Sequence, residues 1–416
     1  MPKNENANRL LLITTAPFAL WAYFRPQIRF LVEHGFEVHA ATSPGALFQE
    51  CKSKLGVPVY AVPMARRISP LADLVSIARL WRLIRKLRPT IVHAHTPKAG
   101  LIGSIAAALA GVDTRIYTIH GLPLVTRTGW RRWILAMAER TTCLAARYVL
   151  CVGPSLRDTV AQLGICRPEH LRVLGHGSCS GIDLNRFSPL SPAIQDRKTT
   201  LGIFDCPDDG PVISFVGRFV HDKGLADLAK AWTVLRGQFP SARLLLCGGF
   251  EAQDPLDPAT LHLLKTDPRV HFSPAFIEDT PSVYAASTVC VLPTFREGLG
   301  HVALESAAMQ KPIVATRIPG CVDSVQDGVT GLLVEPHDPE ALAGAIRRLL
   351  EDEALREQMG REGRLFVAAR FSQESVSRLI LAEYRRLTIL KPGSPAPSAP
   401  LRAPRQDLAS HSADRI

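Results

Sequence analysis

The sequence predicts an α/β protein of two domains, each built on a parallel β-sheet. Three observations support this prediction: the chain has 416 residues, short apolar runs alternate with longer helical stretches, and a Pro/Ser-rich connection separates two such series. Contents of 46% apolar and 21% charged residues are typical of globular domains. We therefore expect two Rossmann-like domains whose sheets face each other across a cleft.

The first domain is expected at residues 1–190. Apolar runs of strand length recur in it, with helical patterns such as 23–35 and 99–110 between them. The predicted strands are 10–15, 37–42, 57–62, 91–95 and 115–119.

The second domain is expected at residues 191–390, after the connection Phe-Ser-Pro-Leu-Ser-Pro-Ala that begins at Phe187. Residues 391–416 are rich in Pro, Ser, Ala and Arg and are expected to be disordered. The predicted helices of the second domain include 225–238, 279–286 and 301–309. Its predicted strands are 212–216, 243–247, 270–273, 289–292, 312–315 and 331–334.

The chain is expected to be cytosolic. No apolar run reaches the roughly 20 residues that span a bilayer, and the polar first residues do not resemble a signal peptide. The nine cysteines lack a paired Cys-x2-Cys spacing, so the sequence favours neither a disulfide framework nor a zinc site.

The formal net charge of +11 is concentrated in the first half. Residues 1–190 hold 24 Lys+Arg and 10 Asp+Glu, whereas residues 191–416 hold 25 and 28. Such a basic half suits nucleic acid, an anionic substrate or a membrane surface. Nucleic acid is not expected as a partner, because no RNP, helix-turn-helix or zinc signature accompanies the charge.

Two basic segments fit helices that lie on anionic lipid at the inner face of the plasma membrane. They fit ordinary surface helices equally well, because long basic side chains also cover apolar surface. One is Arg79-Leu-Trp-Arg-Leu-Ile-Arg-Lys-Leu-Arg88, and the other contains Trp130, Arg131 and Arg132.

The most informative segment is Pro-Thr-Phe-Arg-Glu-Gly-Leu-Gly-His-Val-Ala-Leu-Glu, which ends at Glu305. It joins a predicted buried strand to a helix whose first turn offers unpaired N–H groups to a phosphate. Gly298 and Gly300, on either side of Leu299, allow the backbone to approach a ligand closely. Glu297 and Glu305 can accept hydrogen bonds from sugar hydroxyls. These features predict a nucleotide-sugar site, although a solvated helix start with two unrelated glutamates gives the same spacing.

A second strand end carries paired cations. Ser-Phe-Val-Gly-Arg closes a predicted strand at Gly217 and Arg218, and Lys223 precedes the next helix. An Arg and a Lys at the carboxyl end of a strand are placed to clamp a pyrophosphate, the alternative being two surface cations on a loop. A Rossmann dehydrogenase is not expected, because no G-x-G-x-x-G follows the first strand.

In the first half, Tyr-Thr-Ile-His-Gly-Leu-Pro places His120 at a strand end that faces the expected cleft. Lys98 begins a helix and is expected either to meet an acceptor phosphate or to be an ordinary surface residue. His93 and His95 are expected on opposite faces of their strand, which argues against a shared metal ion.

The spacing of Glu297 and Glu305 resembles the E-x7-E signature of the retaining GT-B glycosyltransferases, in particular glycosyltransferase family 4. The closest resemblance is to bacterial enzymes of capsule, O-antigen and glycan-carrier assembly that extend an undecaprenyl-diphosphate-linked sugar. Further segments resemble this family in order over residues 9–390: Val-His-Ala-His-Thr-Pro-Lys-Ala-Gly-Leu, Thr-Ile-His-Gly-Leu-Pro, Gly-Ser-Cys-Ser-Gly-Ile-Asp-Leu-Asn-Arg-Phe and Asp-Gly-Val-Thr-Gly-Leu-Leu-Val.

The resemblance implies a GT-B fold and transfer of a hexose or N-acetylhexosamine, with retention of configuration, from a UDP-sugar to a lipid-linked acceptor. It implies that Arg218 and Lys223 stabilise the leaving diphosphate, that His120 and Glu297 contact the transferred sugar, and that Glu305 holds the ribose. No metal cofactor is expected, because these cations and the helix start take over its charge role.

One departure from the family pattern concerns the loop after the first strand. Many members place a Gly-Gly pair there, whereas residues 16–24 are apolar and aromatic, and Phe24 is expected to contact lipid or acceptor. A GT-B nucleotide-sugar epimerase and a non-catalytic nucleotide-sugar-binding protein are the alternative functions.

Overall fold

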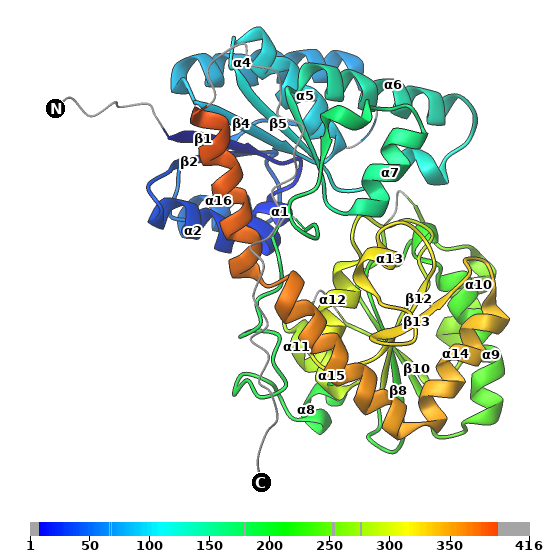
Figure 1. Ribbon diagram of the computed structural model, residues 1–416. Coiled ribbons are helices and arrows are strands. Elements are labelled where there is room, and N and C mark those ends of the chain that lie inside the picture. Colours follow the sequence, from blue (N-terminus) through cyan, green and yellow to red (C-terminus); the bar gives the residue numbers. More distant parts are fainter. Residues whose placement is uncertain are drawn as a thin grey trace, which may run out of the picture.

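The computed structural model describes residues 8–389 apart from 66, 68, 179, 252–253 and 275–276. The protein contains two parallel sheets, one in each domain, which confirms the predicted fold class (Figure 1). One has seven strands in the order β3-β2-β1-β4-β5-β6-β7, and the other has six in the order β10-β9-β8-β11-β12-β13. All neighbouring strands within each sheet run parallel. The expected disordered segment 391–416 lies outside the described residues.

Most strands fall where the apolar runs predict them. β6 and β7 were not predicted, and β7 has only two residues, too few for an apolar run of strand length. The first sheet contains β1 (Arg9–Ile13), β2 (Glu37–Thr42), β3 (Val59–Ala61), β4 (Ile91–His95), β5 (Thr114–Ile119), β6 (Tyr148–Cys151) and β7 (Leu171–Arg172). The second contains β8 (Val212–Val216), β9 (Arg243–Cys247), β10 (Val270–Phe272), β11 (Val289–Leu292), β12 (Ile313–Thr316) and β13 (Gly331–Val334).

The helices of the first domain cover both faces of its sheet. Proline occupies the first turn of many of them, where its missing N–H removes no intrahelical bond. They are α1 (Pro17–Ala19), η1 (Leu20–Phe24), α2 (Arg25–Glu33), α3 (Phe48–Lys54), α4 (Pro70–Leu87), α5 (Pro97–Leu109), η2 (Pro123–Thr126), α6 (Gly129–Ala145), α7 (Pro154–Gln162) and η3 (Pro168–His170).

Several helices of the second half begin at an aspartate whose side chain accepts a hydrogen bond from a backbone N–H of the first turn. The capping residues are Asp196, Asp257, Asp279, Asp338 and Asp352. The helices are α8 (Arg197–Gly202), η4 (His221–Lys223), α9 (Leu225–Gln238), α10 (Pro258–Thr266), α11 (Thr280–Ala286), α12 (His301–Ala308), α13 (Cys321–Ser324), α14 (Pro339–Glu351), α15 (Glu353–Arg370) and α16 (Gln373–Ile389).

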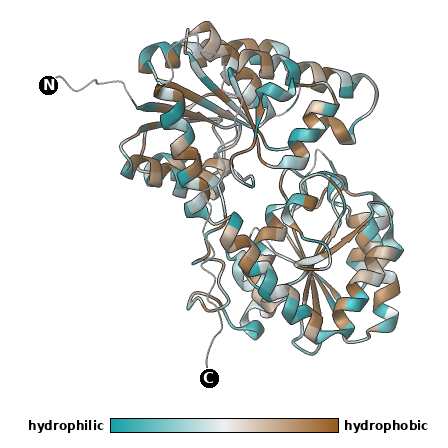
Figure 2. Cartoon of the chain, viewed as in Figure 1, coloured by the Kyte–Doolittle hydropathy of each residue, from teal (hydrophilic) through white to brown (hydrophobic). Residues whose placement is uncertain are grey.

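Buried strands separate two apolar layers in each domain. Alternating side chains of β1 illustrate this: Leu10 and Leu12 pack in the layer that includes α2, whereas Leu11 and Ile13 pack in the layer that includes α4 and α5. Figure 2 shows the hydrophobic strands at the centre of each domain and hydrophilic residues on the outer helix faces. Among the described residues, no helix has both the length and the apolarity needed to cross a membrane.

The last described helix, α16, returns to the first domain and lies beside α2 (Figure 1). Its Tyr384 is buried against β4, and its Glu383 pairs with Arg172 of β7. The chain passes between the domains twice, once near Ile182 and once near Ser372. A parallel β-bridge joins these two residues. The predicted division of the chain at residue 191 remains a prediction, and α16 packs with the first sheet although it follows the second.

Candidate active site

A cavity of about 1230 Å³ lies between the two domains and is lined from both. The strand order of the first sheet reverses between β1 and β4, which are followed by Thr15 and Thr96, and the hydroxyls of these two residues lie 2.7 Å apart. The order of the second sheet reverses between β8 and β11, which are followed by Arg218 and Glu297. Ligands of open α/β sheets bind outside the carboxyl ends of strands at such reversals. The cavity therefore joins the binding positions of both sheets.

The predicted cations Arg218 and Lys223 both line this cavity. Lys223 forms an ion pair with Glu297, and both side chains are largely buried. Arg218 is half exposed, and its Nη1 lies 2.8 Å from the carboxylate of Glu251. Each cation thus has a carboxylate partner, and a diphosphate that enters this end of the cavity would compete with Glu251 and Glu297 for them.

The backbone around Lys223 is fixed by close packing. Gly224 has φ +69°, and a Cβ at this residue would lie 1.7 Å from the carbonyl oxygen of Pro293. Beside it, Asp222 accepts hydrogen bonds from Arg296 at 2.6 Å and from Thr126 of the other domain at 3.2 Å. The loop that carries the lysine is therefore held against β11 and against the first domain at once.

The glycine turn before α12 also touches the first domain. A Cβ at Gly298 would lie 2.1 Å from the carbonyl oxygen of His120, so only glycine fits where these two backbone segments meet. Gly300 caps α12 with φ +52°, and Leu299 between the two glycines lines the cavity. The turn predicted to bind a phosphate is thus also a place where the backbones of the two domains are in close contact.

Glu305 lines the cavity from α12, and its carboxylate accepts a hydrogen bond from the hydroxyl of Tyr284 at 2.8 Å. Burial raises the pKa of Glu305 to about 7, although Tyr284 and the charge of Arg186 oppose this rise. Neither Tyr284 nor Arg186 was predicted as a site residue: Tyr284 is a lone tyrosine in a helix, and Arg186 lies in a segment that resembles the family but was assigned no role. Both act on the carboxylate that the motif identified.

The raised pKa of Glu305 predicts a pH-dependent effect of Glu305→Gln. Glu305 should contribute a loss of stability to the wild-type protein as pH rises from about 4.5 to about 7, because the unfolded chain gives up this proton first. The variant lacks this loss, so its stability relative to wild type should increase across that window, by at most about tenfold in the folding equilibrium constant per pH unit, and then level off. Urea unfolding from pH 4.5 to 8, with the exposed Glu357→Gln as control, measures the difference. An advantage that does not change with pH would contradict the assignment.

His120 follows β5 and lines the cavity as predicted. Its Nε2 lies 3.0 Å from Nδ1 of His95, and burial lowers its pKa to about 4, with a further contribution from His301. His301, the first residue of α12, faces the cavity from the second domain and packs against the ring of Tyr23 at 5.7 Å. Imidazoles from both domains therefore line the same cavity.

The expectation that His93 and His95 face opposite sides of their strand is wrong. Their ring centroids lie 3.9 Å apart, because residues two positions apart on a strand point to the same face. The sequence argument against a shared metal ion therefore fails. Within the described part of the chain, however, no group of three or more His, Cys, Asp or Glu side chains could hold a metal ion.

The aromatic segment after β1 also differs from expectation. Phe24 is only 2% exposed and packs against His95 at 4.3 Å, so it lies behind the cavity wall and does not face an acceptor. Phe24 ends the five-residue π-helix η1, which replaces the expected loop, and other aromatic residues line the cavity instead. These are Phe18, Trp21 and Tyr23.

Of the remaining predicted acceptor residues, one lines the cavity and three do not. Lys98 lines the cavity and pairs with Asp73 of α4 at 2.7 Å. Trp130, Arg131 and Arg132 are exposed at the start of α6, outside the cavity lining. The same helix sends four later residues into the cavity wall, namely Ile134, Leu135, Ala138 and Glu139.

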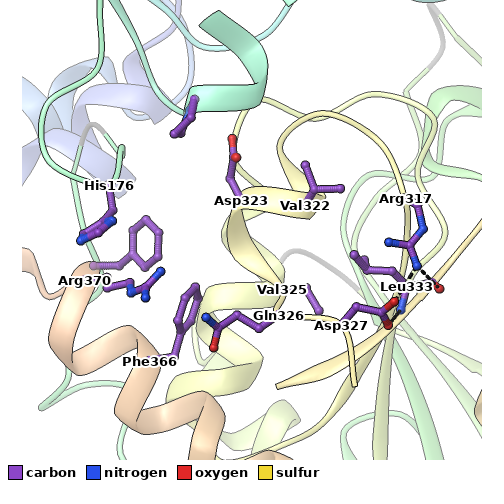
Figure 3. A pocket seen from close by; sticks show the side chains of 12 residues that line it. His176, Arg317, Val322, Asp323, Val325, Gln326, Asp327, Leu333, Phe366 and Arg370 are labelled. Carbon is purple, nitrogen blue, oxygen red and sulfur yellow. Dashed lines mark hydrogen bonds and ion pairs between the residues drawn. The ribbon is translucent and has the colours of Figure 1, made fainter. Parts of the chain in front are cut away.

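A second cavity of about 420 Å³ lies where α7, α13 and the end of α15 meet (Figure 3). Its Arg317 is neutralised by Asp327 and Glu335. Asp323 accepts hydrogen bonds from the hydroxyl and backbone N–H of Ser155 at 2.6 and 3.0 Å, so it ties the second domain to α7. None of the predicted site residues lines this cavity, and its contacts serve the domain junction.

Two parallel-sheet domains that share one cleft, with cations and carboxylates suited to a sugar diphosphate, define a protein of the GT-B glycosyltransferase class. Comparison with family models agrees. Residues 196–366 match the model of glycosyl transferases group 1, and residues 19–177 match a glycosyl transferase 4-like domain.

Known proteins are similar over most of the chain. The capsular polysaccharide biosynthesis glycosyltransferase CapM of Staphylococcus aureus is 32% identical over 352 residues, which cover 85% of this chain and 90% of that protein. Among solved structures, a glycosyltransferase of Rickettsia africae has a TM-score of 0.75 at 19% identity, covering 92% of this chain and 99% of its own. Anabaena Alr3699/HepE in complex with UDP has a TM-score of 0.72 at 20% identity, covering 91% and 100%. The chain belongs to glycosyltransferase family 4, within the GT-B glycosyltransferases.

Proposed function

We propose that this glycosyltransferase moves a hexose or N-acetylhexosamine from a UDP-sugar to an undecaprenyl-diphosphate-linked acceptor, with retention of configuration, in the assembly of a bacterial surface polysaccharide such as capsule or O-antigen. The observation that carries the proposal is the single cavity that brings Arg218, Lys223, Glu297 and Glu305 of the second domain together with His120 of the first. The role of CapM in capsular polysaccharide biosynthesis supports the pathway. The complexes of HepE with UDP and with UDP-glucose support the donor class.

The donor end of the cavity suits a sugar diphosphate without a metal ion. Arg218 and Lys223 lie beside the start of α12, so fixed positive charge is available where a departing UDP gains negative charge. Glu305 holds the ribose, Glu297 and His120 contact the transferred sugar, and Gly217 with Gly298–Gly300 supplies backbone at the phosphates.

The reaction takes place on one face of the sugar. The bond between the anomeric carbon and the UDP oxygen breaks, the acceptor hydroxyl oxygen attacks from the same side, and its proton passes to the departing phosphate oxygen. No side chain is needed as a covalent nucleophile, so configuration is retained without the two-carboxylate arrangement of retaining glycosidases.

The acceptor end of the cavity is lined by two helices whose outward faces suit a lipid-linked substrate. Pro70 and Asp73 at the start of α4 and Ile134 of α6 line the cavity, and the outward faces of the same two helices carry exposed apolar side chains. Exposed apolar and basic groups on these two helices, which both pack against α5, favour binding to an anionic membrane surface. The exposed apolar residues are Leu71, Leu74, Val75 and Trp81 on α4, and Trp130, Trp133 and Met137 on α6.

Vesicle binding tests the membrane contact. Trp130 and Trp133 are each 65% exposed, and replacing both by serine should lower the affinity for phosphatidylglycerol vesicles by about tenfold or more while leaving UDP binding unchanged. Leu365→Ser is the matched control, because Leu365 is 64% exposed on α15. Equal vesicle affinity of wild type and the tryptophan variant would remove this surface from the proposal.

UDP release tests the activity itself. Purified protein should release UDP from one sugar donor in a panel of UDP- and GDP-sugars, and only when a membrane lipid extract is present. UDP or free monosaccharide produced without lipid would favour an epimerase that uses the same cleft. Tight nucleotide binding without release from any donor would favour a non-catalytic nucleotide-sugar-binding protein.

A further inference from the structure

His120 is contacted behind the cavity wall by a second imidazole. Its Nε2 lies 3.0 Å from Nδ1 of His95, which is only 2% exposed and does not line the cavity. Burial lowers the pKa of both rings, that of His120 to about 4 and that of His95 well below its usual value. At neutral pH both rings are uncharged. The hydrogen bond between them therefore requires that one of the two facing nitrogens, Nδ1 of His95 or Nε2 of His120, carries a proton and that the other accepts it.

The surroundings of His95 decide which nitrogen carries the proton. Among the described residues, Nε2 of His95 is buried and has no hydrogen-bond partner. A proton on this Nε2 would leave a buried N–H without an acceptor, and buried N–H groups without partners are rarer than buried acceptors without partners. The proton of His95 therefore belongs on Nδ1, which donates to Nε2 of His120. His120 must then carry its own proton on Nδ1.

The orientation of His95 is fixed in turn by its neighbour. The ring of His93 lies 3.9 Å from that of His95. His93 is held at both nitrogens, by the hydroxyl of Tyr384 at 2.6 Å and by the hydroxyl of Thr118 at 2.7 Å. Because Tyr384 lies on α16, the returning C-terminal helix supports the imidazoles behind the cavity wall.

We propose that His95 is a positioning residue which holds His120 as its Nδ1–H tautomer, so that His120 offers a ligand in the cleft an N–H donor rather than an acceptor. A donor at this place suits a hydroxyl oxygen of the transferred sugar. This last statement rests on the proposed function, whereas the tautomer itself does not depend on it.

Imidazole ¹⁵N chemical shifts test the tautomer directly. Protein labelled with [¹⁵N]histidine, with His120 assigned from the spectrum of His120→Gln, should show His120 protonated at Nδ1 and unprotonated at Nε2. In His95→Leu the donor is lost, and His120 should move toward the Nε2–H form that free neutral histidine prefers. His95→Asn keeps an amide N–H donor and should keep the wild-type tautomer. His262→Leu, on the exposed surface of α10, controls for removal of a histidine.

Wild-type His120 protonated at Nε2 would overturn the proposal, and so would an unchanged tautomer in a folded His95→Leu variant. If His95→Leu does not fold, the wild-type and His95→Asn spectra still decide. In the transfer assay, His95→Leu should lower kcat about tenfold with little change in UDP affinity, and His95→Asn should restore most of it. If the tautomer is as expected but no sugar is transferred by wild-type protein, the proposed function fails and the structural assignment stands.

Discussion

Lys223→Met should lower kcat by about 10² to 10³-fold while the fold is retained. Lys223 lies largely buried in the cleft. In the proposed reaction its fixed positive charge stabilises the departing UDP more strongly than the intact UDP-sugar. The loss should therefore appear in kcat with a smaller change in KM. Steady-state UDP release in the presence of lipid acceptor measures both constants.

The partner of Lys223 requires a second variant, because Lys223→Met leaves the largely buried carboxylate of Glu297 without its cation. Lys223→Met/Glu297→Gln removes that unpaired charge, so it should recover stability but not activity. Lys230→Met, on the exposed surface of α9, is the matched control and should behave as wild type. If the double variant regained activity, Lys223 would serve only to neutralise Glu297.

Gly298→Ala should abolish activity, with a loss of about 10³-fold or more, because the new methyl group would lie 2.1 Å from the backbone oxygen of His120. Backbone cannot rotate away as a side chain can, so the contact between the domains must open. His120 would then move away from the glycine turn and from Glu297. Small-angle X-ray scattering should report a larger radius of gyration for the variant than for wild type.

Gly237→Ala is the matched control for this substitution. Gly237 lies in α9, and a Cβ there meets no atom within 4 Å, so the change should be neutral or slightly stabilising. Full activity of Gly298→Ala would show that the contact between its turn and His120 is not needed for the reaction.

Most of the fold could be predicted from the sequence, because buried parallel strands form short apolar runs between turn residues. The runs at β8, β9, β11 and β13 coincide with the observed strands. The two-residue β7 carries no such signal, and the return of α16 to the first domain depends on tertiary contacts. Tyr384 and Glu383 make those contacts, with His93 and Arg172 respectively, and the sequence of α16 does not indicate these partners.

The candidate site was predictable where its residues follow strands, because parallel strands end at one edge of a sheet. This rule located His120, Arg218 and Glu297. The rule does not predict the ion pairs of these cations with Glu251 and Glu297, or the hydrogen bond from Tyr284 to Glu305. Phe24 was misplaced because residues 16–24 were expected to form a loop, whereas they form α1 and η1 and bury Phe24.

Transfer of a labelled sugar from donor to lipid tests the central claim most directly. The donor selected by UDP release, labelled in its sugar, would be incubated with membrane lipid extract, and the organic phase would be analysed for label and for the configuration of the new glycosidic bond. Label should enter the lipid fraction with the anomeric configuration of the donor, and Lys223→Met should suppress this. Label that stays in the aqueous phase, or a lipid product of inverted configuration, would contradict retaining transfer to a lipid-linked acceptor.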